Sequence, residues 1–293
     1  MRATLWGLWE VASVSNLLRA GFARYLKNPL NALVAVASLV IGLLGGRNAV
    51  YTIDDVYLIA LFIAFAAFIS LFIGREHGEG GFRNKAITGY TKGQIFFSEW
   101  LLHTVFCLAM LLLFLVGFAL LAHEVLSPVP AGMLALITLC LMMMMVAVVT
   151  LLCTLTLLVS QRAVSAILSV LLVIGLLFAS YSIDSALQRP RYYYAEHYDE
   201  NDELILVEKT ESPLYIDGVA RTLLTHLNYA LPLGQAQPLV SSIGIWNYDG
   251  DAYVFNYERE HLDKIKLFPL YSLAVIVLSG GIGYVIFRRR DLQ

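Results

Sequence analysis

Six long apolar stretches constrain this chain more than any other feature of its sequence. A helix needs about 20 mostly apolar residues to cross a hydrocarbon core of roughly 30 Å. Windows of that kind, bounded by charged residues, Pro or Gly, run over residues 30–46, 56–74, 100–122, 131–160, 163–183 and 268–287. The sequence therefore predicts an all-α polytopic membrane protein with six transmembrane helices.

The composition indicates the same class of protein. Hydrophobic residues make up 59% of the 293 residues and charged residues 14%, and the mean hydropathy is +0.71. Soluble domains average roughly 45–50% apolar and 25% charged residues, and a chain this apolar could not bury its surface in water. A net charge of −2 also argues against a basic nucleic-acid-binding surface, so we expect no nucleic-acid partner.

The first 29 residues are expected to form an interfacial elbow helix. Charged residues such as Glu10, Arg19 and Arg24 interrupt the apolar run, so the segment resembles neither a signal peptide nor a span. Its apolar residues nevertheless recur at near-helical spacing: Leu17, Leu18, Phe22, Tyr25 and Leu26. That pattern is typical of a helix lying in the membrane interface.

The distribution of Lys and Arg predicts the orientation of the spans. With the N-terminus inside, the inner segments hold 12 Lys and Arg residues, whereas the two short outer loops hold only Arg47. Inner loops carry an excess of positive charge in membrane proteins. Both termini are therefore expected on the cytosolic side.

Residues 184–266 then lie outside and are expected to form a small α+β extracellular domain between spans five and six. They carry 7 Lys and Arg against 14 Asp and Glu, and 9 of the 16 Tyr. One hairpin is predicted across a turn at 199–202, and a second across Asp249-Gly250 between 246–248 and 253–255. Apolar residues at 216–227 repeat at helical spacing and stop before Pro232, which predicts a helix.

Residue types that carry chemistry are scattered along the chain. Cys107, Cys140 and Cys153 lie in predicted spans, the six His residues lack metal-ligand spacing, and no Walker-type phosphate-binding motif occurs. No catalytic residue and no metal site are therefore expected. Glu99 and His103 are the nearest candidates for a proton relay in a span, and the alternative is that Glu99 pairs with a nearby Lys or Arg.

The loop between the second and third spans is the most specific stretch. It reads as two short helical stretches separated by glycines, with Phe82, Ala86 and Ile87 on one side and Arg83 and Lys85 on the other. Such an amphipathic segment can dock into a groove on a soluble partner. A solvated basic loop that satisfies the positive-inside rule explains the pattern equally well.

This loop resembles the coupling-helix region of type-2 ABC exporter permeases, particularly those of Gram-positive peptide-antibiotic (lantibiotic and bacteriocin-type) resistance and immunity systems. The shared pattern is an acidic residue, Gly, Arg-Asn-Lys, a second Gly, and Thr-Lys. It corresponds here to Glu76 or Glu79, Gly80, Arg83-Asn84-Lys85, Gly89 and Thr91-Lys92. Leu231-Pro232-Leu233-Gly234-Gln235 and the ending at 287–292 are also similar. Gly81 and Phe82 depart from the pattern, and the outer segment is longer than the family's short hairpin, which suggests an added recognition or gating role.

The resemblance implies a permease subunit without enzymatic activity in a bacterial plasma membrane. Its partners would be a cytosolic ABC ATPase, a second permease copy or paralogue, and membrane lipid. ATP and Mg²⁺ would bind the ATPase, and no cofactor would bind this chain. The residues implied in coupling to the ATPase are Phe82, Arg83, Asn84, Lys85, Ile87, Gly89 and Lys92.

The expected organisation follows the chain in four parts. They are an elbow helix at 1–29, spans one to five at 30–183 with a coupling helix at 76–95, an extracellular domain at 184–266, and the sixth span with a basic tail at 267–293. An apolar pathway and an acidic, Tyr-rich outer domain fit export of an amphipathic or cationic antimicrobial peptide. A lipid, another hydrophobic drug and a polysaccharide precursor stay open as substrates.

Two other classes of protein stay open as alternatives. A membrane sensor or accessory protein would bind a ligand with its outer domain and would copurify with a kinase or regulator instead of an ATPase. An intramembrane enzyme would need paired carboxylates, paired His residues, or Ser with Lys in the spans. The sequence shows no such constellation.

Overall fold

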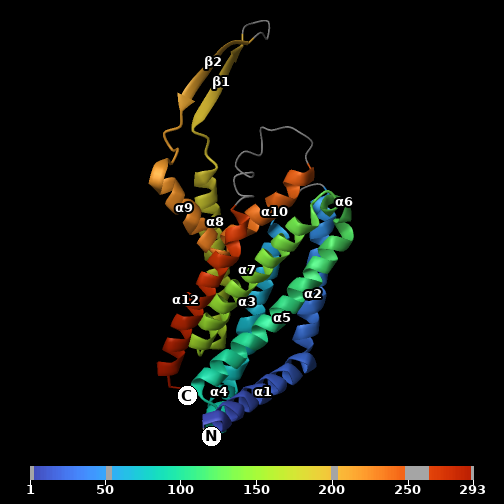
Figure 1. Ribbon diagram of the computed structural model, residues 1–293, viewed down its shortest axis with the longest axis vertical. Helices are drawn as coiled ribbons and strands as arrows, with labels where there is room; N and C mark the ends of the chain where they lie inside the picture. The colour runs from blue at the N-terminus through green and yellow to red at the C-terminus, as the bar shows by residue number, and fades with distance from the viewer. Residues whose placement is uncertain (1–2, 51–54, 199–203, 248–263, 292–293) are drawn as a thin grey trace.

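The computed structural model describes residues 3–50, 55–198, 204–247 and 264–291 (Figure 1). Six helices in these residues are long and apolar enough to cross a membrane. They are α2 (Pro29–Ala49), α3 (Val56–Gly78), α5 (Lys92–Leu121), α7 (Ala131–Leu158), α8 (Arg162–Leu187) and α12 (Phe268–Arg289). The expectation of an α-helical polytopic membrane protein with six spans is confirmed. Two short elements, α6 (His123–Leu126) and the 3-10 helix η3 (Ile265–Leu267), lie in connections.

The predicted elbow helix is present as α1 (Ala3–Lys27). It runs obliquely across the end of the bundle at which both termini lie (Figure 1). Asn28 separates it from α2, because the Asn28 side chain accepts a hydrogen bond from the Leu30 amide at 3.0 Å and Pro29 occupies the first turn. Asn as N-cap followed by Pro is a strong start signal for a helix, so a new helix begins here in a new direction.

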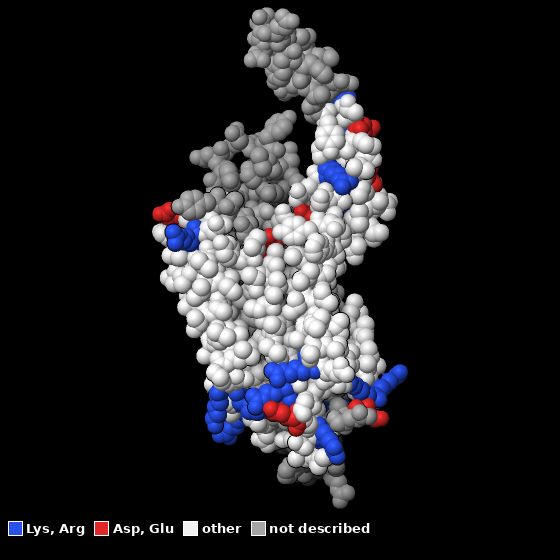
Figure 2. All heavy atoms as spheres, turned by 180° about the vertical axis from the view of Figure 1, so that it is seen from behind, with Lys and Arg blue, Asp and Glu red and all other residues white. Residues whose placement is uncertain are grey.

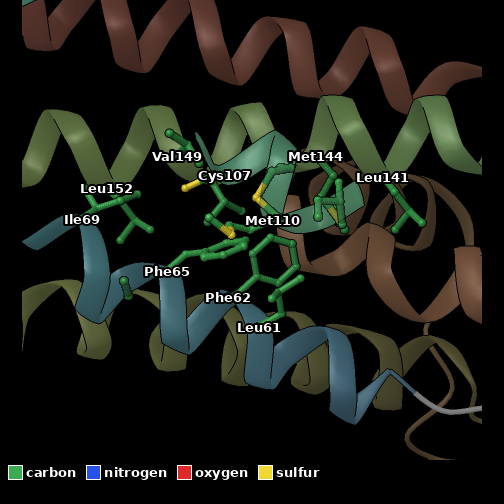
Figure 3. Packing of buried hydrophobic residues seen from close by; sticks show 14 of the residues in the cluster. Leu61, Phe62, Phe65, Ile69, Cys107, Met110, Leu141, Met144, Val149 and Leu152 are labelled. Carbon is green, nitrogen blue, oxygen red and sulfur yellow. The ribbon is translucent and has the colours of Figure 1, made fainter. Parts of the chain in front are cut away.

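Helices α3 and α7 form the centre of the bundle. In each, 61% of the most apolar window is buried within the chain, against 28% or less for α2, α8 and α12. Figure 3 shows Phe62, Phe65 and Ile69 of α3 facing Met144 and Val149 of α7, with residues of α5 beside them. Met144 and Met145 are fully buried and belong to this packing. The outer faces of the peripheral helices are left to contact lipid.

Helices α2 and α5 approach each other closely along a row of glycines. A Cβ on Gly42 or Gly46 would collide with the backbone carbonyl of Phe114 or Phe118, and one on Gly117 would lie 2.6 Å from the Leu39 carbonyl oxygen. Apolar side chains gain little from association in lipid, so helix pairs there depend on close van der Waals contact between small residues. The glycines therefore hold α2 to the bundle.

Substitution of Gly42 tests this contact. Gly42→Ala should lower the free energy of unfolding in detergent by about 1–3 kcal/mol, because the added methyl forces the helices apart. The matched control is Gly175→Ala on α8, where a Cβ meets no atom within 4 Å. Thermal unfolding followed by tryptophan fluorescence measures both variants, and an equal shift for the two would contradict the close-contact explanation.

The opposite end carries the segment between α8 and α12. Strands β1 (Tyr192–Tyr198) and β2 (Leu204–Glu211) pair antiparallel, with Tyr192 opposite Glu211, and project beyond the spans (Figure 1). This confirms the first hairpin, and α9 (Gly218–Ala230) confirms the helix. The second hairpin is wrong at Trp246 and Asn247, since the chain leaves α10 (Ala236–Gly244) directly into the 3-10 helix η2 (Ile245–Asn247). Its remainder lies outside the described residues.

The Leu231–Gln235 motif packs against the ends of the spans. It forms the 3-10 helix η1 (Pro232–Gln235), which is buried. The Gln235 side-chain amide donates to the Tyr229 carbonyl at 2.8 Å, and its oxygen accepts from the Ser272 hydroxyl of α12 at 3.1 Å. The Ser180 hydroxyl of α8 donates to the Asn228 side chain at 3.1 Å. These bonds tie α9 and η1 to α8 and α12.

Candidate functional site

Basic side chains gather at the end of the bundle where the termini lie. Figure 2 shows Lys and Arg concentrated there, while the middle of the face in view is nearly free of charge. The short helix α4 (Gly81–Ile87) stands at this end between α3 and α5. Gly80 with φ of 67° and Gly89 with φ of 96° flank it. Both angles lie in the left-handed region that glycine adopts without strain, which allows the chain to reverse twice within a few residues.

The two faces of α4 have different surroundings. Phe82 is 3% exposed and packs edge-on against His77, with ring centroids 4.6 Å apart, and against Phe287 of α12 at 6.4 Å. Arg83, Asn84 and Ile87 face outward, and Ile87 is 71% exposed. One face of α4 is therefore packed against the spans, and the other face is exposed.

The predicted division of α4 into faces is wrong at two positions. The sequence pattern placed Ile87 beside Phe82 and Lys85 beside Arg83, whereas Lys85 lies on the buried side and Ile87 on the exposed side. Lys85 follows Phe82 by three residues, which is the spacing of one helix face. The charge of Lys85 is tolerated on the buried side because the carboxylates of Glu76 and Glu99 lie there and pair with it.

Lys85 bridges the helices on either side of α4. Its Nζ lies 2.8 Å from Glu76 Oε2 on α3 and 2.5 Å from Glu99 Oε1 on α5. The three side chains are only 12%, 8% and 4% exposed, respectively for Lys85, Glu76 and Glu99. A buried charge of this kind is costly unless it is paired and hydrogen-bonded. The interpretation of Glu99 as a residue paired with a nearby cation is confirmed, and Glu76 is a second carboxylate partner of that cation.

Helix α1 joins the same network. Arg24 forms an ion pair with Glu76 Oε1, so the two carboxylates meet two cations and the four charges cancel. The neighbouring Tyr25 ring stacks between Phe72 of α3 at 3.7 Å and Phe106 of α5 at 4.3 Å. Burial raises the pKa of Tyr25 well above its ordinary value, so its hydroxyl stays neutral. The end of α1 is thereby fixed to α3 and α5.

His103 completes the buried cluster on α5. Its Nδ1 lies 2.7 Å from the Glu99 carbonyl oxygen and therefore carries the proton, and it lies 3.9 Å from Glu99 Oε2. Among the described residues, Glu99 Oε2 and His103 Nε2 are buried without a hydrogen-bond partner. Glu99 thus binds Lys85 of α4 through Oε1, and its Oε2 lies on the side of His103.

Lys92 ties the other side of the loop to the C-terminal tail. Its Nζ donates to the carbonyls of Arg290 at 2.5 Å and Arg288 at 3.2 Å. These carbonyls lie at the end of α12, where unpaired acceptors carry partial negative charge. Thr91 begins α5 with a capping box, accepting from the Gln94 amide at 3.2 Å while its own amide donates to the Gln94 side chain at 2.9 Å.

The structure separates the seven predicted coupling residues into three groups. Phe82, Lys85 and Lys92 contact other helices, Gly89 forms a bend, and Arg83, Asn84 and Ile87 are exposed. Sequence reasoning did not connect Arg24 to the loop. Its place near the end of α1, four residues before Asn28, indicated where Arg24 lies along the chain but gave no sign of its partner Glu76.

Comparisons with known proteins do not add to this picture. No protein-family model matches the chain, and no match was found among the curated proteins. Within the described ranges, no group of three His, Cys, Asp or Glu side chains is arranged to hold a metal ion.

Removal of the Lys85 charge tests the network. Lys85→Met should lower the free energy of unfolding by about 3–5 kcal/mol, because Glu76 and Glu99 lose a buried partner. Adding Glu99→Gln should restore part of that loss, since one uncompensated carboxylate disappears.

The control is Arg83→Met, which removes a positive charge from the exposed face of the same helix. We expect it to change stability by no more than about 0.5 kcal/mol. Denaturation in detergent measures all three variants. Equal effects of Lys85→Met and Arg83→Met would show that the Lys85 contacts contribute nothing specific.

Proposed function

We propose that this chain is the permease subunit of an ATP-driven type-2 ABC exporter and that α4 contacts a cytosolic ATPase. One observation carries the proposal. The helix α4 exposes Arg83, Asn84 and Ile87 while Phe82 and Lys85 hold its other face to the spans. A helix with one exposed face and one face bound to the spans is suited to transmit a movement of a soluble partner to the membrane helices.

The anchoring explains how such a movement would spread. Lys85 bonds to α3 through Glu76 and to α5 through Glu99. A displacement of α4 alone would leave these carboxylates without Lys85, and an unpaired buried charge costs several kcal/mol. Helices α3 and α5 should therefore move with α4 when the ATPase pair closes on ATP. Differential contact of this kind is what a two-state transmission requires.

The proposal assigns a place to each part of the chain. The basic end and both termini lie in the cytosol of a bacterial cell, following the excess of Lys and Arg there, and α1 lies in the membrane interface. Residues 184–266 form an extracellular domain. A second copy or a paralogue completes the pathway, and ATP and Mg²⁺ bind the ATPase subunits. The chain itself catalyses no reaction.

The substrate class is proposed from the polarity of the surfaces. The middle of the face that Figure 2 shows is nearly free of charge, and the outer segment is acidic with 14 Asp and Glu against 7 Lys and Arg. An apolar path beneath an acidic surface suits an amphipathic, cationic antimicrobial peptide. The exporter would remove such a peptide from the membrane or the cell.

Copurification tests the proposal. The chain is expressed with its chromosomal neighbours and purified in mild detergent, and the ATPase activity of the copurifying proteins is measured. We expect a stoichiometric ATPase subunit that carries a Walker motif. Arg83→Glu and Ile87→Asp should each weaken its capture about tenfold, because they place negative charge on the docking face.

The control is Arg289→Glu, which makes the same charge reversal at an exposed position of the same end that does not belong to α4. It should leave capture unchanged. Purification of the chain alone, or with a signalling protein and no ATPase, would overturn the permease proposal and favour a membrane sensor.

A further inference from the structure

A polar cavity lies beside α4 at the basic end. It has a volume of about 360 Å³ and is lined by residues from four separate segments. They are His77 at the end of α3, Phe82 and Arg83 of α4, Ser160 between α7 and α8, and Arg290 and Asp291 after α12. Neither the buried Lys85 network nor the exposed tip at Ile87 belongs to it.

The cavity is organised around Arg290. The Arg290 Nη1 donates to the Leu157 carbonyl at 3.2 Å, and Nη2 donates to the Ser160 hydroxyl. These two bonds fix the guanidinium, whose five N–H groups leave three for another acceptor. The Ser160 oxygen accepts from Arg290, so its own O–H is available to donate. Lys92 holds the backbone of the tail through the Arg288 and Arg290 carbonyls.

The charges in the cavity favour an anion. Arg83 is exposed and has no hydrogen-bond or ion-pair partner among the described residues. Arg83 and Arg290 outweigh the single carboxylate of Asp291, and the His77 ring adds a polar wall beside the Phe82 ring. Guanidinium groups bind phosphate oxygens through paired N–H donors, so a phosphate group is the ligand chemistry that fits.

The position of the cavity favours a phosphate carried by lipid. Its lining residues Ser160 and Arg290 lie just before α8 and just after α12, two helices with only 22% and 17% of their apolar windows buried in the chain. Such helices face the bilayer along their length, and their ends lie at the level of lipid headgroups. Basic pockets between spans on the cytosolic side suit acidic headgroups.

We propose that this cavity binds the headgroup of an acidic phospholipid, with Arg83, Arg290 and Ser160 donating to its phosphate. The site is a property of the chain by itself, and it does not depend on the proposed ATPase. Occupancy would place a lipid against α4, since Arg83 and Phe82 belong to that helix.

Native mass spectrometry of the purified, delipidated chain tests the assignment. Titration with phosphatidylglycerol should give a single retained lipid, and phosphatidylcholine should bind at least about fivefold more weakly. Arg83→Gln and Arg290→Gln should each reduce phosphatidylglycerol binding about fivefold, the effect of one favourable charge contact. Because Arg83 has no structural bond to lose, its variant separates ligand binding from folding.

The matched control is Arg289→Gln, which removes the same charge from an exposed position next to the cavity. It should leave binding unchanged, and a loss equal to that of Arg83→Gln would overturn the site in favour of diffuse surface attraction. Displacement of the lipid by an equal concentration of inorganic phosphate would assign the cavity to free phosphate instead. Equal affinity for the two lipids, or lipid retention only when an ATPase is bound, would also overturn the proposal.

Discussion

The arrangement of helices at the basic end of this molecule depends on one constraint: a buried carboxylate must be paired with a cation. Glu99 lies on a predominantly apolar span with a 4% exposed side chain, where an unpaired negative charge would cost several kcal/mol. Lys85 meets that need and also pairs with Glu76, which in turn holds Arg24. A single requirement of electrostatics thus fixes α4, α3, α5 and the end of α1 relative to one another.

This arrangement leaves the remaining surface of α4 free for partners. The buried side is neutral in total charge and closely packed, whereas the exposed side presents Arg83, Asn84 and Ile87. The cavity that contains Arg83 and Arg290 opens beside that face. A docking partner and a lipid headgroup would therefore meet the same short helix, which offers a physical route by which the bilayer composition influences docking.

Apolar windows predicted all six spans because the cost of exposing the backbone and apolar side chains acts locally along the chain. The third span was placed too late, from Trp100 instead of Lys92, because Glu99 interrupts the window. Its charge is neutralised by Lys85, which belongs to a different helix. For the same reason periodicity assigned Lys85 and Ile87 to the wrong faces of α4. The rule that apolar side chains face the interior and charged ones face outward fails where a buried group of opposite charge can pair with the charged side chain.

The sequence alone determined the number of spans, the excess of positive charge at one end, the hairpin at residues 192–211 and the glycine-bounded helix between the second and third spans. These features follow from hydropathy, charge and turn preferences over short distances. Only the tertiary structure decided which charges are buried together, that Arg24 joins Glu76, and that Arg290 and Arg83 share a cavity. Such pairings join residues far apart in the chain, and their energy depends on burial, which no local pattern records.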